Sequence, residues 1–340
     1  MTVPLSDDRR AALVAARTAS LARDHLGLEV DAGAFAEFAH HGAAAMVDRH
    51  AVIDLGNAPG SGLGAGLVWA VRHGAVSCDL IVDPDAATRR DPGVLARQAQ
   101  LFAPAPRIWV LAGDQLTEAE PAPHEPPVVP PPDTAEQVLL LRQAGLEVVV
   151  EQGEVIGEIR GLEVARVVVH DGGAHLEVGV GRFDREAFGL LHGDLSPPEA
   201  LARVVDQIRS LRAPGAEPHP VNRLVRERWL RHQIIDAPET VGATRLDAVE
   251  RPRARGGLRD TAIASALGRR ADGEALVVAA SVGVDLDAVP DAADTRAWHA
   301  PDAHLMLVVP TGDVHPVTRQ LVDRLARPAE IVEVDPEWSR

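Results

Sequence analysis

The 340-residue chain contains no lysine and no tyrosine, and all 34 of its basic residues are arginine. The absence of lysine excludes a P-loop lysine, a Schiff-base lysine and a lysine general base, whatever the fold. Alanine, valine, arginine, aspartate, glycine and proline are used heavily, which is typical of a GC-rich genome such as that of an actinobacterium. We therefore attribute the use of arginine in place of lysine to codon bias rather than to function.

One cysteine, Cys78, is too few for an internal disulfide or for a cysteine-based zinc site. It begins the segment CDLIVD, residues 78–83, whose apolar run is typical of a buried strand. We expect Cys78 to be a buried strand residue, since nothing in the sequence places a histidine beside it to activate the thiol.

Long apolar runs are also missing. No segment approaches the ~20 apolar residues that cross a bilayer, and the first residues mix acidic side chains with arginines. The formal net charge of −16 argues against broad binding to nucleic acids, because phosphate affinity comes mainly from basic residues. The sequence therefore predicts an acidic globular protein of a bacterial cytoplasm.

One segment is locally basic. Residues 221–235, VNRLVRERWLRHQII, predict a helix that carries Trp229 among the arginines Arg223, Arg226, Arg228 and Arg231. We expect Trp229 to pack against a core. If the helix is exposed, the four arginines form a patch for an anionic partner such as nucleic acid, which favours a non-enzymatic interaction module.

A proline-rich segment, residues 118–133, divides the chain because it can form neither a helix nor a paired strand. Before it, strands and helices alternate over residues 1–117, which predicts a small α/β domain with a parallel sheet layer. After it, residues 134–340 predict a larger α/β domain with a mixed sheet and an irregular insertion at 213–274. Both ends of the chain use the same succession of strand, helix and strand, but we identify no internal repeat.

A glycine-rich turn joins a predicted strand to a predicted helix in residues 52–66, VIDLGNAPGSGLGAG. Backbone N–H groups of such a turn can surround a pyrophosphate, and Gly60, Gly62 and Gly64 are the candidates. Asp83 ends the next strand, where a ribose-binding acid would lie. The spacing fits G-x-G-x-x-G only approximately, so a loop whose small residues permit tight packing stays the alternative.

Other polar clusters have structural explanations. Asp285, Asp287, Asp291 and Asp294 follow a predicted strand at the edge where α/β sheets bind ligands, yet acids also cap helices and stabilise their first turn. We expect the structural role for these aspartates. The 14 histidines are scattered, and none has the H-x-x-x-H spacing with a carboxylate that a helical zinc site requires.

Residues 161–182, GLEVARVVVHDGGAHLEVGVGR, predict two paired strands with Glu163 on one and Glu177 on the other. A two-residue turn, Asp171–Gly172, places Glu177 opposite Arg166 and turns Glu163 to the other face of the sheet. A three-residue turn brings both glutamates to one face, but about 13 Å apart along the strand. Neither register closes a site in which the two carboxylates share a metal ion.

The order of elements around this hairpin resembles the α-β-β-β-α-β core of the PD-(D/E)XK nuclease-like, or restriction-endonuclease-like, superfamily. The matching elements are helix 134–145, strands within 147–159, the hairpin, helix 197–212, strand 275–281, a helix and strand 304–309. The resemblance implies that an acid on one strand and an acid-x-lysine on the next bind Mg²⁺, which activates water for phosphodiester cleavage. Glu163 matches the first acid and Glu177 the second, whereas Gly179 stands where the lysine should be.

These observations predict an α/β protein of nuclease-like fold with a degenerate catalytic site. Glu163 and Glu177 are the catalytic and Mg²⁺-binding residues that the resemblance implies, but Arg166 favours a structural ion pair. Glu151, Glu154 and Glu158 on the preceding strands could substitute for them, because the sequence does not determine their faces. The alternatives are a nucleotide- or dinucleotide-binding protein that uses the Gly60–Gly64 loop, and the interaction module described above.

Overall fold

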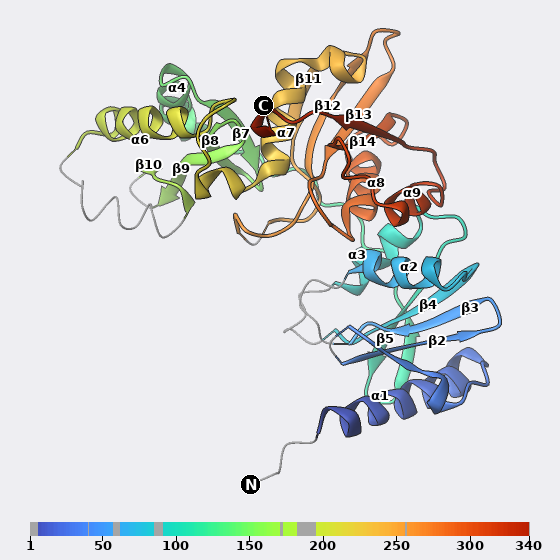
Figure 1. Ribbon diagram of the computed structural model, residues 1–340. Coiled ribbons are helices and arrows are strands. Elements are labelled where there is room, and N and C mark those ends of the chain that lie inside the picture. Colours follow the sequence, from blue (N-terminus) through green and yellow to red (C-terminus); the bar gives the residue numbers. More distant parts are fainter. Residues whose placement is uncertain are drawn as a thin grey trace. The chain divides into compact units, whose positions relative to one another are not determined.

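The computed structural model describes residues 6–39, 41–56, 62–84, 91–170, 173–181, 195–255 and 257–339. The chain forms two compact units, whose helices and strands are labelled in Figure 1. Unit 1 comprises Met1–His124, Leu286–Asp294 and His315–Ala329, and unit 2 comprises Glu125–Asp285, Thr295–Val314 and Glu330–Arg340. The first division therefore falls within the proline-rich segment, and two stretches of the predicted domain 134–340 belong to unit 1. No helix in the described part of the chain is both long and apolar enough to span a bilayer.

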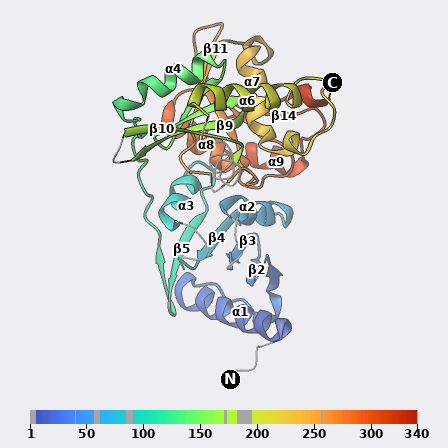
Figure 2. The ribbon, with the colours of Figure 1, turned by 90° about the vertical axis from the view of Figure 1, so that its left-hand side faces the viewer.

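Unit 1 contains a six-stranded sheet of order β1-β2-β3-β4-β5-β6. Its strands are β1 (Ala36–Phe38), β2 (Gly42–Val47), β3 (His50–Asp54), β4 (Ser77–Val82), β5 (Arg107–Ala112) and β6 (Gln115–Glu118). β3, β4 and β5 run parallel, as predicted, and the remaining neighbours are antiparallel. Helix α1 (Asp7–Leu21) covers one face, and α2 (Leu63–Arg72) and α3 (Pro92–Ala99) cover the other (Figures 1 and 2). Coverage of both faces explains why the central strands are mostly apolar.

Two helices of unit 1 begin in the same way. In α3, Asp91 accepts a hydrogen bond from the N–H of Gly93 at 2.8 Å and Pro92 follows the cap. In α9 (Pro316–Val322), His315 is the capping residue and Pro316 follows it. Proline suits the first helical position because its missing N–H would have no partner there. Beyond both helices the chain forms an isolated antiparallel bridge between Phe102 and Leu325.

The first part of unit 2 is a four-stranded antiparallel sheet of order β10-β9-β8-β7. Its strands are β7 (Glu147–Glu151), β8 (Glu154–Ile159), β9 (Leu162–His170) and β10 (Gly173–Val178). Helices α4 (Ala135–Gln143) and α6 (Pro197–Leu211) lie on one face of this sheet (Figure 1). Leu141, Val204 and Val205 pack there against Val155 and Leu162. The other face carries the charged side chains.

The second part of unit 2 is a five-stranded mixed sheet of order β11-β12-β13-β14-β15. Its strands are β11 (Ala243–Val249), β12 (Ala264–Arg270), β13 (Ala275–Ala280), β14 (His304–Pro310) and β15 (Glu330–Val334). Helix α7 (Arg226–Asp236) packs on it through Leu230 and Ile234, which contact the cluster of Leu246, Leu276 and Val308. The helix predicted at 221–235 is α7, but the expected irregular insertion at 213–274 is wrong, since β11 and β12 within it are strands of this sheet.

The fold class is α/β, as predicted, but the elements assigned to one nuclease-like sheet are divided between two. The hairpin of β9 and β10 belongs to the antiparallel sheet, with β10 at its edge, whereas β13 and β14 belong to the five-stranded sheet. The order α-β-β-β-α-β occurs instead in α7, β11, β12, β13, α8 (Ala288–His299) and β14. Our placement of that order over residues 134–310 was wrong because strand patterns do not reveal which strands pair.

Unit 1 repeats the same order in α1, β1, β2, β3, α2 and β4. Strands β1 to β5 and β11 to β15 follow one another without a crossover in both sheets. In each, the first three strands are antiparallel neighbours and the last three are parallel. The succession of strand, helix and strand noted at both ends of the sequence thus corresponds to one topology used twice.

Candidate functional site

The charged face of the four-stranded sheet is the main candidate site. Side chains two residues apart on a strand share a face, and the register places the charged positions of neighbouring strands side by side. Glu158 lies opposite Glu147 on β7 and opposite Glu163 on β9, and Glu177 lies opposite Arg166. The acidic positions on this face are Glu147, Glu151, Glu154, Glu158, Glu163 and Glu177.

The strands of the hairpin pair in the register that we predicted for a two-residue turn. Gly173 pairs with His170 and Glu177 with Arg166, although Asp171 and Gly172 themselves lie outside the described residues. The expected orientation of Glu163 is wrong, because the pairing of β8 with β9 shifts between Gly157 and Glu158. This irregularity adds one residue to β9 and returns Glu163 to the face of Arg166.

Glu163 is held by Arg166. Arg166 donates from Nε to Oε1 and from Nη2 to Oε2 of Glu163, both at 3.0 Å, and it also forms an ion pair with Glu154. Burial alone would lower the pKa of Arg166, but its hydrogen bonds and charge interaction with Glu163 outweigh burial and raise the pKa. Both oxygens of Glu163 are therefore bound to one guanidinium in a two-pronged contact.

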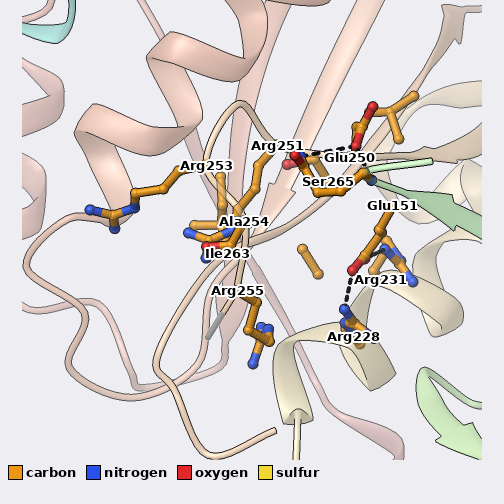
Figure 3. A pocket seen from close by; sticks show the side chains of 13 residues that line it. Glu151, Arg228, Arg231, Glu250, Arg251, Arg253, Ala254, Arg255, Ile263 and Ser265 are labelled. Atoms are coloured by element: carbon orange, nitrogen blue, oxygen red, sulfur yellow. Dashed lines mark hydrogen bonds and ion pairs between the residues drawn. The ribbon is translucent and has the colours of Figure 1, made fainter. Parts of the chain in front are cut away.

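Glu158 is fully buried between two arginines of α7. Arg228 Nη1 donates to Oε1 at 2.9 Å, and Arg231 Nη2 donates to Oε2 at 2.6 Å. Both arginines also form ion pairs with Glu151, as Figure 3 shows for Arg228. Burial alone would raise the pKa of Glu158, but the charges of Arg231 and Arg228 outweigh it and hold the pKa below its ordinary value.

Local backbone geometry brings α7 onto this face. Gly161, in the turn between β8 and β9, has φ +73°, and a Cβ there would lie 2.3 Å from the backbone carbon of Arg228. Only glycine permits this approach. Arg228 and Arg231 are three residues apart, so they share a helix face and point together at Glu158.

The predicted Mg²⁺ pair, Glu163 and Glu177, lies in adjacent rows of one face, and metal binding by the pair stays a prediction. Glu163 shares a row with Glu158, whereas Glu177 shares the row of Arg166. Within the described ranges, no group of three or more His, Cys, Asp or Glu residues is arranged to hold a metal ion. The side chains that meet Glu158 and Glu163 are arginines, which supply the positive charge that a buried carboxylate needs.

At the glycine-rich loop, a side chain of the protein lies where the sequence predicted a bound pyrophosphate. Gly60 lies outside the described residues, but the N–H of Gly64 donates to Asp287 Oδ1 at 2.9 Å. A Cβ at Gly64 would lie 1.7 Å from the carbonyl oxygen of Leu286, and one at Gly62 would lie 2.3 Å from Asp287 Oδ2. The carboxylate of Asp287 thus lies at the N-terminus of α2, where a phosphate would bind. Nucleotide binding by Gly60, Gly62, Gly64 and Asp83 stays a prediction.

The other aspartates of this acidic stretch also have protein partners. Gln98 Nε2 donates to Asp291 at 2.9 Å. Arg97 donates to both oxygens of Asp294 at 2.9 Å, and His124 Nε2 lies 2.8 Å from the same carboxylate. These contacts support the structural role that we expected for them.

The arginine-rich helix does not present one exposed patch. Trp229 is completely buried, as expected, with the guanidinium of Arg212 lying 4.5 Å from its ring centre. Arg228 and Arg231 are also buried, because Glu158 lies beneath them. Only Arg223 is exposed, and Arg226 lies half-buried 5.7 Å from the ring of Trp338. The predicted surface of four arginines is therefore wrong, since the charged side of α7 faces the sheet.

Sequence reasoning missed a second polar cluster, in unit 1. His50 Nδ1 lies 2.7 Å from Ser77 Oγ, and His50 Nε2 lies 2.8 Å from Asp79. This is the order of a Ser-His-Asp chain, but Arg107 also donates to both oxygens of Asp79, at 2.6 and 2.7 Å. Because Arg107 balances the buried Asp79 charge, we assign the cluster to joining β3, β4 and β5. No sequence motif links residues so far apart.

Comparisons with known proteins give little guidance. No protein-family model and no curated protein sequence matches the chain. Among solved structures, EndoMS in its apo form is similar over 65% of this chain and 73% of that chain, with 16% identity and a TM-score of 0.24. A TM-score this low carries no structural argument, so the functional interpretation rests on the residues described above.

Proposed function

We propose that this protein has a nuclease-like order of elements with a degenerate catalytic site. The observation that carries the proposal is the arginine contacts of Glu158 and Glu163. These buried carboxylates are cross-strand neighbours, and each is bound by arginine: Glu158 by Arg228 and Arg231, Glu163 by Arg166.

Metal-dependent hydrolysis of a phosphodiester needs convergent carboxylates that can bind Mg²⁺. In this sheet a Mg²⁺ ion would have to displace Arg166 from Glu163, or Arg228 and Arg231 from Glu158. Displacement would leave Arg166 with Glu154, or the buried Arg228 and Arg231 with Glu151, as the remaining acidic partner, and the loss of a partner for a buried charge is unfavourable. The chain also has no lysine to place beside an attacking water.

The five-stranded sheet supports the same proposal. Its elements follow the nuclease-like order, and the resemblance requires acids on consecutive strands. The corresponding strands have the sequences ASALGRR in β12 and ALVVAA in β13, which contain no acidic residue. In the four-stranded sheet the acids are bound by arginines, and in the five-stranded sheet these two strands carry none, which supports a degenerate site in either placement.

The test is a cleavage assay on single-stranded and double-stranded DNA with Mg²⁺ or Mn²⁺. We expect no metal-dependent cleavage above background. The variants Glu163→Gln and Glu177→Ala are the controls, because any cleavage that both retain does not depend on these two glutamates. Metal-dependent cleavage that disappears in Glu177→Ala or Glu163→Gln and survives in Arg166→Ala would show an active site and overturn the proposal.

A further inference from the structure

A pocket in unit 2 lies beside the ion pairs of Glu151 (Figure 3). Its walls come from α7, the end of β11, the loop that follows β11 and the start of β12. Five arginines line it, together with two glutamates. The arginines are Arg228, Arg231, Arg251, Arg253 and Arg255, and the glutamates are Glu151 and Glu250.

The two glutamates of the lining are already engaged by the protein. Glu151 forms its ion pairs with Arg228 and Arg231. Glu250 accepts hydrogen bonds from the backbone N–H of Gln152 at 2.6 Å and from Gln152 Nε2 at 3.1 Å. The charge of Glu151 is balanced by its two arginines. Glu250 is held by neutral N–H donors and keeps its negative charge, so the five arginines of the lining have to outweigh it.

The buried arginines have donating capacity beyond their protein contacts. Arg228 and Arg231 are only 4% and 3% exposed, and their contacts are the ion pairs with Glu151 and Glu158. Arg255 donates to Glu227 and to the carbonyl oxygen of Asp260. A guanidinium carries more N–H donors than such contacts use, and its geometry suits the oxygens of a phosphate.

Ser265, at the start of β12, supplies an independent observation. It is 2% exposed and lines the pocket, and its Oγ has no hydrogen-bond partner among the described residues. Buried polar groups in folded proteins nearly always have a partner, so an unpaired hydroxyl in a pocket wall points to a ligand or solvent group there. A hydroxyl beside several guanidinium groups matches a ligand with several acceptor oxygens.

We propose that this pocket binds a phosphate group, either as free phosphate or as the terminal group of a small phosphomonoester. Arg251 and Arg255 hold the phosphate from the loop side, Arg228 and Arg231 from the helix side, and Ser265 donates its hydroxyl. Because the net charge of the chain is −16, the long-range field repels anions and the affinity comes from these local contacts. Phosphate binding in this pocket does not depend on whether the glutamates of the four-stranded sheet are catalytically inactive.

The experiment is calorimetric titration of the full chain with sodium phosphate, with adenosine 5′-monophosphate and with adenosine, all at one ionic strength. We expect saturable binding of phosphate or of the monophosphate and none of adenosine. Phosphate binding alone identifies the free anion as the ligand, whereas tighter binding of the monophosphate identifies a phosphomonoester.

Two pocket variants and one matched control locate the site. Ser265→Ala and Arg251→Gln should each weaken binding roughly tenfold or more, since a hydrogen bond to a charged group is lost. Arg245→Gln is the control, because Arg245 lies on β11, outside the pocket lining, with its side chain 79% exposed, and should bind like the wild type. Ser265→Ala should unfold at the wild-type temperature or above it when phosphate is absent, which shows that the variant is folded.

Absence of saturable binding by both phosphate and the monophosphate would overturn the inference. Equal affinity of the wild type, Ser265→Ala and Arg251→Gln would overturn it as well, because the ligand would then lie elsewhere. The cleavage assay is a separate measurement, so either proposal can fail without the other.

Discussion

Replacement of Glu158 by glutamine tests the charged cluster most directly. The exchange keeps the shape of the side chain and removes its charge, which leaves Arg228 and Arg231 with Glu151 as their remaining acidic partner. Removal of one partner from a buried ion pair costs about 3–5 kcal/mol, because the other charge stays buried. We expect Glu158→Gln to lower the free energy of unfolding of unit 2 by about this amount at pH 7.

The effect should depend on pH in a defined direction. The pKa of Glu158 in the folded protein lies below the ordinary glutamate value of 4.5, since the charges of Arg231 and Arg228 outweigh the burial that would raise it. A carboxyl group with a lowered pKa stabilises the folded state above its unfolded pKa, and this contribution is lost as pH falls through the folded pKa. The difference between wild type and Glu158→Gln should therefore be constant near neutral pH and shrink below pH 4.5.

The assay is urea unfolding followed by tryptophan fluorescence, with the free energy obtained by linear extrapolation. A background with Trp69→Phe and Trp109→Phe leaves tryptophans in unit 2 alone, where Trp229 is completely buried. The matched control is Glu177→Ala on the exposed part of the same sheet, for which we expect a cost of about 0.2–1 kcal/mol.

The reasoning would be refuted if the free energy of unfolding of Glu158→Gln at pH 7 differed from that of its background by less than about 1 kcal/mol. Such a difference is well below the cost of leaving a buried charge without a partner. A difference that grew as pH fell below the ordinary glutamate pKa would also refute it, because the pKa of Glu158 would then be raised by folding rather than lowered.

Two further predictions concern the helix cap and the thiol. Ser196→Ala should lower the free energy of unfolding by about 1 kcal/mol, because Ser196 and Glu199 form a capping box at the start of α6. The control is Ser210→Ala in the last turn of α6, which should lower the free energy of unfolding by less. Equal losses of stability in the two variants would contradict the capping role. Burial raises the pKa of the Cys78 thiol to about 12, so the folded protein should resist a thiol reagent at pH 8 that labels the urea-unfolded chain at once. Equally fast labelling of the folded protein would contradict the burial of Cys78.

Short-range patterns in the sequence determined several features correctly. The apolar runs of β3, β4 and β5 separated by helical segments predicted the parallel layer of unit 1. The two-residue turn predicted that Glu177 lies opposite Arg166, because a tight turn sets the register of the strands beside it. The helix predicted over residues 197–212 is α6, and its start is local because Ser196, two prolines and Glu199 act within one turn of a helix.

Strand composition limited what could be predicted elsewhere. β12, with the sequence ASALGRR, has no β-branched residue, so its composition does not favour a strand. Its burial comes from its neighbours β11 and β13. The sequence therefore could not show that one sheet topology occurs twice, because the two copies share strand pairing rather than a residue pattern.

Only the tertiary structure decided which charges meet. Glu158 and its partners Arg228 and Arg231 are 70 and 73 residues apart in the chain, and they meet because Gly161 lets α7 approach the sheet. The irregular pairing beside Glu158 turned Glu163 toward Arg166, against the simple alternation of strand faces. Sequence alone determined the elements whose causes lie within a few residues. The neutralised glutamates and the arginine-lined pocket depend on long-range packing, whose partners no local pattern specifies.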